Sequence, residues 1–123
     1  VGDGSQKRDF LYVSDVANAF HKAGITDKVG EIYNLGAGNP QSINYLVKLL
    51  DGPVKNIPKR PGEPQVTWAD TSKIIKELGW KPKVSFEEGV KKVLAEINYW
   101  KDAPLWDEKS IETVTKTWFN NLH

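Results

Sequence analysis

Short apolar runs that favour β-structure alternate along this chain with longer segments of helical periodicity, and this alternation restricts the possible folds more than any other feature. The expected strands cover residues 10–13, 32–35, 54–57 and 66–68. The expected helices begin near residues 14, 42, 70, 85 and 108. Alternating strands and helices are typical of α/β proteins, so the sequence predicts a small α/β domain of three to four short strands and about five helices.

Residues that favour helix ends support these boundaries. Ser14 and Asp70 are placed to cap the first and third helices, and residues 85–88 form a capping box. Gly24 and Gly79 follow the last periodic positions of two helices, where glycine commonly ends a helix. The helix after residue 85 is expected to continue to residue 100 with one apolar stripe.

Residues 102–123 are expected to form a linker and a last helix, which begins near residue 108. The side chains of Trp100, Trp106 and Trp118 are expected to pack this tail against a domain of residues 1–101. Tryptophans interleaved with lysines could instead stack on single-stranded nucleic acid. Their helical spacing and the net charge of +1 favour packing.

Charge and composition argue against several classes of function. A net charge of +1 disfavours a nucleic-acid or anionic-membrane partner. The chain has no cysteine, and neither His21 nor His123 has a ligand-spaced partner, so no metal site is expected. No apolar run approaches the roughly 20 residues that cross a bilayer. A cytoplasmic location is therefore expected.

Arginine is used sparingly, since only two of the 17 basic residues, Arg8 and Arg60, are arginine. Unlike lysine, arginine presents a flat fork of donors that binds two oxygens of a phosphate or carboxylate together. Two isolated arginines at loop edges suggest one anion held from two sides. The alternative is that both make structural ion pairs, for which the adjacent Asp9 and the nearby Glu63 are the candidates.

Blocks of this sequence, in the right order and at plausible spacing, resemble the substrate-domain half of NAD-dependent sugar-nucleotide epimerases and dehydratases. These enzymes are extended short-chain dehydrogenases, and UDP-glucose 4-epimerase is one of them. The similar blocks are residues 2–17 (Gly-Asp-Gly-Ser to Asp-Val-Ala), 32–38 (Ile-Tyr-Asn-Leu-Gly-Ala-Gly), 60–63 (Arg-Pro-Gly-Glu), 68–70 (Trp-Ala-Asp) and 78–82 (Leu-Gly-Trp-Lys-Pro). The resemblance implies that the chain is the small substrate-binding domain of such an enzyme.

The resemblance also implies roles for four residues. In this family, the arginines at the positions of Arg8 and Arg60 hold the diphosphate of a nucleotide sugar. Gln6 would lie beside that diphosphate, and Glu63 would either orient Arg60 or accept a ribose hydroxyl. None of these residues would be catalytic, because hydride and proton transfer belong to another part of the enzyme.

Two family motifs are absent from residues 1–123, namely the Gly-x-x-Gly-x-x-Gly turn that binds NAD and the catalytic Tyr-x-x-x-Lys pair. The Gly36-Ala37-Gly38 turn is a poor substitute, because Gln41 stands where the third glycine of a dinucleotide fingerprint would be. We therefore expect the carboxyl-terminal portion of an enzyme, inactive and without NAD of its own, although the full-length enzyme would bind NAD.

The expected partners are a nucleotide-diphosphate sugar and either the missing amino-terminal half or a second copy of the chain. The strand at residues 32–35 would be an unpaired sheet edge, which favours association into a dimer. The alternative function is a stand-alone, non-enzymatic binding or oligomerisation module derived from such an enzyme.

Overall fold

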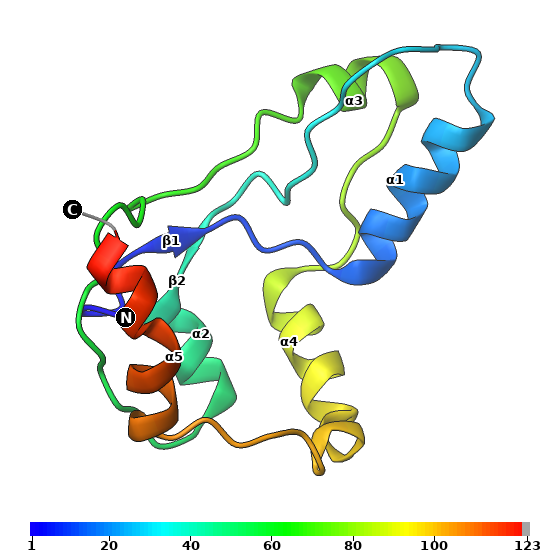
Figure 1. Cartoon of the computed structure of the whole chain (residues 1–123). Helices are drawn as coiled ribbons and strands as arrows, with labels where there is room; N and C mark the ends of the chain where they lie inside the picture. Colours follow the sequence, from blue (N-terminus) through cyan, green and yellow to red (C-terminus); the bar gives the residue numbers. More distant parts are fainter. Residues whose placement is uncertain (122–123) are drawn as a thin grey trace.

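The computed structural model describes residues 1–121, apart from the side chains at positions 108, 118 and 119. Within this range the elements are β1 (Lys7–Arg8), α1 (Val13–Ile25), β2 (Gln41–Ser42), α2 (Ile43–Leu50), α3 (Ser72–Leu78), α4 (Phe86–Ala95), the 3-10 helix η1 (Ile97–Trp100) and α5 (Glu108–Asn121). β1 and β2 pair antiparallel, with Lys7 opposite Ser42. Figure 1 shows α1 and α3 at one end of the molecule and the sheet, α2 and α5 at the other. Helices around a small sheet confirm the α/β class.

The strands themselves lie elsewhere than expected. Residues 10–13, 32–35, 54–57 and 66–68 do not form strands, although Val66 makes an isolated parallel bridge with Lys7. A β-favouring run becomes a strand only where a neighbouring segment supplies the ladder hydrogen bonds. Two of these runs serve packing instead, because Leu11, Tyr33 and Leu35 lie against the buried core.

The core is small and joins α1, α3 and the segment that follows α3. Trp80 is 0% exposed and packs with Ala19 and Ile74, which are each 2% exposed. The indole Nε1–H of Trp80 donates to the backbone oxygen of Asp15 at 3.0 Å. The Asp15 carboxylate accepts from the backbone N–H groups of Lys83 and Val84, both at 3.0 Å. Asp15 therefore ties the start of α1 to the chain that enters α4.

Most helix boundaries are close to those expected, but the helix expected to reach residue 100 ends at Ala95 and is followed by the separate η1. Ser85 accepts a hydrogen bond from the Glu88 N–H at 3.2 Å, and Gly79 ends α3 with a φ of 57°. Ser14 is not a cap, because α1 begins at Val13 and its first turn closes on the carbonyl of Tyr12. Asp70 lies one residue before the cap position and still accepts from the Ser72 N–H at 2.9 Å.

The tail is helical, but two of its tryptophans do not anchor it. Trp100 and Trp106 are 59% and 62% exposed, and the Trp118 side chain lies outside the described residues. The start of α5 is capped by Asp107, which accepts from the Ser110 N–H at 2.8 Å while its own N–H donates to the Ser110 hydroxyl at 2.9 Å. The division of the chain at residue 101 stays a prediction.

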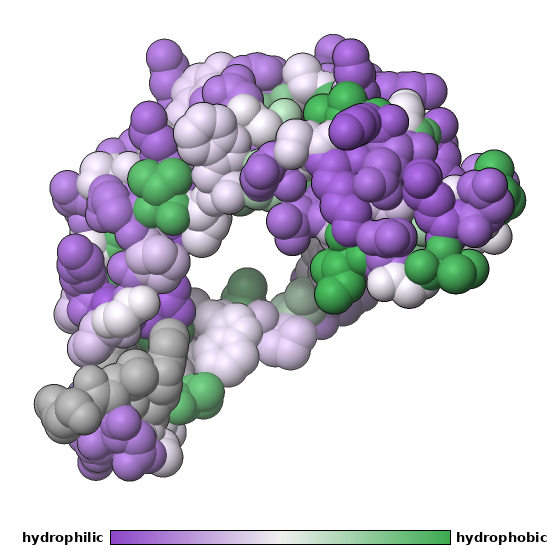
Figure 2. Space-filling model, turned by 90° about the horizontal axis from the view of Figure 1, so that it is seen from above, coloured by the Kyte–Doolittle hydropathy of each residue, from purple (hydrophilic) through white to green (hydrophobic). Residues whose placement is uncertain are grey.

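Several large apolar side chains lie on the surface, among hydrophilic ones in the view of Figure 2. On α1, Phe20 is 71% exposed, although its neighbour Ala19 is buried in the core. Val29 and Ile32, which follow α1, are 86% and 82% exposed. Across the described part of the chain, no helix combines the length and hydropathy of a membrane span.

Candidate functional site

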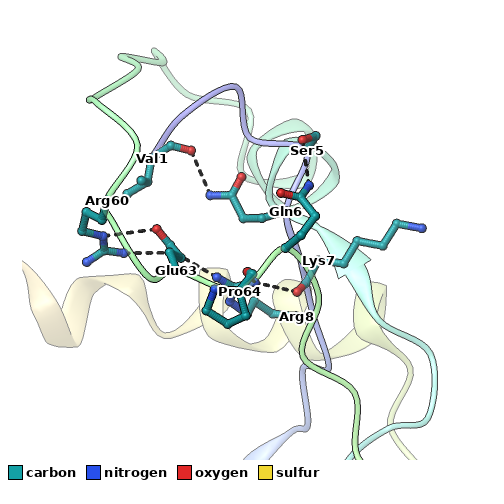
Figure 3. Close-up of polar contacts among 9 residues, drawn as sticks. Val1, Ser5, Gln6, Lys7, Arg8, Arg60, Glu63 and Pro64 are labelled. Carbon is teal, nitrogen blue, oxygen red and sulfur yellow. Dashed lines mark hydrogen bonds and ion pairs between the residues drawn. The ribbon is translucent and has the colours of Figure 1, made fainter. Parts of the chain in front are cut away.

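The two arginines meet on one carboxylate, that of Glu63. Arg8 Nη2 lies 2.8 Å from Glu63 Oε1. Arg60 approaches the same carboxylate from the other side, with Nη2 3.2 Å from Oε1 and Nε 3.3 Å from Oε2. Figure 3 shows Glu63 between the two guanidinium groups. Arg60 thus contacts both oxygens of the Glu63 carboxylate, whereas Arg8 contacts one of them through a single nitrogen.

Backbone structure holds the two forks in place. Arg8 ends β1, and its Nη1 also donates to the carbonyls of Lys7 at 2.8 Å and Pro64 at 3.0 Å. Arg60 lies in a proline-rich loop that turns at Gly62, where φ is 73°. Proline fixes its own φ, so this loop has few alternative conformations and holds Arg60 at a small entropic cost.

The cluster is partly shielded from water, and its two guanidinium groups and one carboxylate leave it with a net charge of +1. The side chains of Arg8, Arg60 and Glu63 are 23%, 32% and 16% exposed. The hydrogen bond from Arg60 lowers the pKa of Glu63 below its ordinary value of 4.5, and Arg8 acts in the same direction. Glu63 is therefore ionised at neutral pH and keeps both arginines directed inward.

Asp9, the other candidate ion-pair partner, is engaged elsewhere. Its carboxylate accepts from the backbone N–H of Gly38 at 3.0 Å and from that of Ala69 at 3.2 Å. A Cβ added at Gly36 would overlap this carboxylate. The glycine turn is thus shaped by the close approach of an aspartate, and its Gly38 amide is already bonded.

The remaining expected site residue, Gln6, lies beside the cluster. Gln6 is 8% exposed and its Nε2 donates to the carbonyl of Val1 at 2.9 Å. Together with Glu63 and Lys59 it lines a hollow of about 150 Å³. Sequence reasoning missed Lys59, and its position directly before Arg60 was the available signal. Among residues 1–121 there is no group of three metal-binding side chains.

Glu63 should make the stability of the folded chain depend on pH. Because its pKa is lowered on folding, its contribution is complete above the ordinary value of 4.5 and is lost as the pH falls through the lowered value. We expect the urea midpoint to fall on acidification, and Glu63→Gln to remove part of that fall. The matched control is Asp27→Asn, which removes an exposed carboxylate outside the cluster. Equal pH dependence in wild type and Glu63→Gln would contradict this account.

Comparison with known proteins identifies the family. A family model described as GDP-mannose 4,6 dehydratase matches residues 1–93. The chain belongs to this family. UDP-glucuronate 4-epimerase of Thermodesulfobacterium geofontis is 37% identical in a 120-residue alignment that covers 92% of this chain and 34% of that protein. The dTDP-glucose 4,6-dehydratase of Shigella flexneri is 36% identical in a 107-residue alignment that covers 76% of this chain and 30% of that enzyme.

Solved structures that resemble this chain agree with this assignment. UDP-glucose 4-epimerase from Thermotoga maritima, solved with UDP-glucose, matches 80% of this chain with a TM-score of 0.73 and 36% identity. UDP-glucuronic acid 4-epimerase from Bacillus cereus, in complex with UDP-glucuronic acid and NAD, matches 80% with a TM-score of 0.72 and 36% identity. The match covers 33% and 34% of those two chains. The chain therefore spans about a third of the length of these relatives, and the expected similarity to NAD-dependent epimerases and dehydratases is confirmed.

Proposed function

We propose that this chain supplies the diphosphate-binding part of the nucleotide-sugar site in an NAD-dependent sugar-nucleotide epimerase or dehydratase. The observation that carries the proposal is the convergence of Arg8 and Arg60 on one anionic group, the Glu63 carboxylate. A diphosphate offers more oxygens and more negative charge to the same two forks. Arginine binds phosphate through paired hydrogen bonds, which makes this arrangement chemically suited to it.

In this proposal Glu63 holds the site ready for its ligand. Its carboxylate holds the two guanidinium groups in place, directed at the diphosphate position, when no ligand is bound. With ligand bound, Glu63 would either continue to orient Arg60 or accept a hydroxyl of the ribose. Gln6 and Lys59 line the adjoining hollow and would lie beside the diphosphate.

The chemistry of the whole enzyme would lie outside this chain. Residues 1–123 contain neither a Tyr-x-x-x-Lys pair nor a Gly-x-x-Gly-x-x-Gly turn. We propose that hydride and proton transfer, with NAD as cofactor, depend on the remaining two-thirds found in the relatives, and that the enzyme is cytoplasmic. This chain alone would bind nucleotide sugars without converting them.

A second candidate is a stand-alone binding or oligomerisation module. The exposed apolar side chains Phe20, Val29 and Ile32 favour it, because such surface commonly contacts another protein chain. Sedimentation of the purified chain, combined with nucleotide titration, distinguishes this module from the proposed nucleotide-sugar site. A dimer that binds no nucleotide would support the module over the nucleotide-sugar site.

Calorimetric titration of the purified chain tests the proposed function directly. We expect saturable binding of UDP, UDP-glucuronic acid and dTDP-glucose, weaker binding of UMP, and no binding of NAD. UMP is the matched control because it retains the nucleoside but lacks the second phosphate. A folded chain that binds none of the diphosphates would contradict the proposal, and saturable NAD binding would contradict the expected absence of a cofactor site.

A further inference from the structure

The arginine–glutamate cluster separates two hollows of the molecule. Glu63 lines the smaller hollow, together with Gln6 and Lys59. Arg60, which is bonded to Glu63, lines a larger hollow of about 590 Å³. The walls of the larger hollow are the loop at residues 56–60 and one face of α5. A ligand held by both arginines would therefore adjoin α5 as well as β1.

The face of α5 that lines the larger hollow carries one cation. Its residues are Ile111, Glu112, Thr115, Lys116 and Asn120. They recur at helical spacing, so they belong to one side of α5. The GDP-mannose 4,6 dehydratase family model ends at residue 93, so this helix lies beyond the segment that defines the family.

We propose that Lys116 is a further cation of the diphosphate site, in addition to Arg8, Arg60 and Lys59, and that α5 is one of its walls. The inference rests on the proposed function and names a recognition residue of that same site. A nucleoside diphosphate brings at least two negative charges to a cluster that already contains the Glu63 carboxylate. A further cation facing the same hollow as Arg60 offsets that charge.

The order of charges on α5 is consistent with this role. Glu112 lies one turn before Lys116 and lines the same hollow. An anionic ligand is therefore drawn toward the Lys116 end of the face and away from Glu112. Lys116 is exposed, so its attraction is long-range and is screened by salt.

The test is titration of the full chain with UDP at low and high ionic strength. We expect Lys116→Gln to weaken UDP binding by about threefold at low salt, with the difference vanishing at high salt, as for an exposed charge. Lys116→Arg should retain wild-type affinity. Lys109→Gln is the matched control, because it removes the same charge from the same helix at a position that does not line the hollow. Urea midpoints confirm that each variant is folded.

Arg60→Lys, titrated in parallel, separates the two proposals. Weakened binding by Arg60→Lys, with Lys116→Gln and Lys109→Gln indistinguishable from each other, would overturn the role of Lys116 and leave the proposed function standing. Weakened binding by both Arg60→Lys and Lys116→Gln supports both. A folded wild-type chain that does not bind UDP overturns both.

Discussion

Replacing Trp80 by alanine is expected to lower the free energy of unfolding by about 3–5 kcal/mol, the usual cost of removing a buried aromatic side chain. Trp80 is 0% exposed and is the largest member of a core that includes Ala19 and Ile74. Its loss leaves a cavity and also leaves the carbonyl of Asp15 without the indole donor at 3.0 Å. Urea denaturation followed by circular dichroism measures the change.

The matched control is Trp106→Ala, which removes the same side chain from a position that is 62% exposed. We expect it to change stability by less than about 1 kcal/mol, as is usual for surface substitutions. Trp80→Phe is an intermediate case, because it keeps one aromatic ring and removes the pyrrole part of the indole together with the N–H donor, so we expect a smaller loss than for Trp80→Ala. Similar losses for Trp80→Ala and Trp106→Ala would mean that the core described around Trp80 does not govern folding.

Replacing Arg8 or Arg60 by lysine is expected to weaken nucleoside-diphosphate binding by roughly tenfold each, since lysine keeps the charge and loses the fork. The two guanidinium groups share one carboxylate in the structure and would share one diphosphate in the complex. The effects of the two substitutions should therefore not add in a double-mutant cycle. Titration with UDP of the wild type, both single variants and the double variant measures the coupling.

The same four proteins test the alternative that the cluster is purely structural. A structural ion pair predicts that each lysine variant loses folding stability while diphosphate affinity is unchanged. Lys91→Gln on α4 serves as the control, because it removes a charge from an exposed position outside the cluster. Additive effects on affinity would argue that the arginines contact different parts of the ligand.

The helices could be predicted from the sequence because their signals are local. Apolar spacing, the Ser85 cap and the terminal Gly79 lie within the segments that they define, and most observed ends lie close to those expected. The exception is α4, which ends at Ala95 although its apolar spacing continues to residue 100. The strands could not be placed in the same way. Whether residues 32–35 form a strand depends on a partner segment, and no local pattern states which segments will be neighbours. The exposure of Phe20 likewise depends on which segments pack against α1, and local apolar spacing does not show this.

Part of the candidate site could be predicted from the sequence for a different reason, because arginine is scarce in this chain. Arginine occurs at only two of 17 basic positions, so Arg8 and Arg60 stand out in the sequence itself. Lys116 does not, because lysine is the common basic residue of this chain, and Lys59 is marked only by its position directly before Arg60. That Glu63 would serve both arginines at once also required the folded geometry.

The contact of Asp9 with the glycine turn bears on how this protein can diverge. A side chain at position 36 is excluded by the Asp9 carboxylate and by the Cβ of Ala69, and that carboxylate is held by the amides of Gly38 and Ala69. The two positions are therefore expected to covary among descendants of this sequence, with glycine persisting at 36 for as long as aspartate persists at 9. A motif search that scores only the glycines of this turn would therefore overlook Asp9, whose carboxylate requires glycine at position 36.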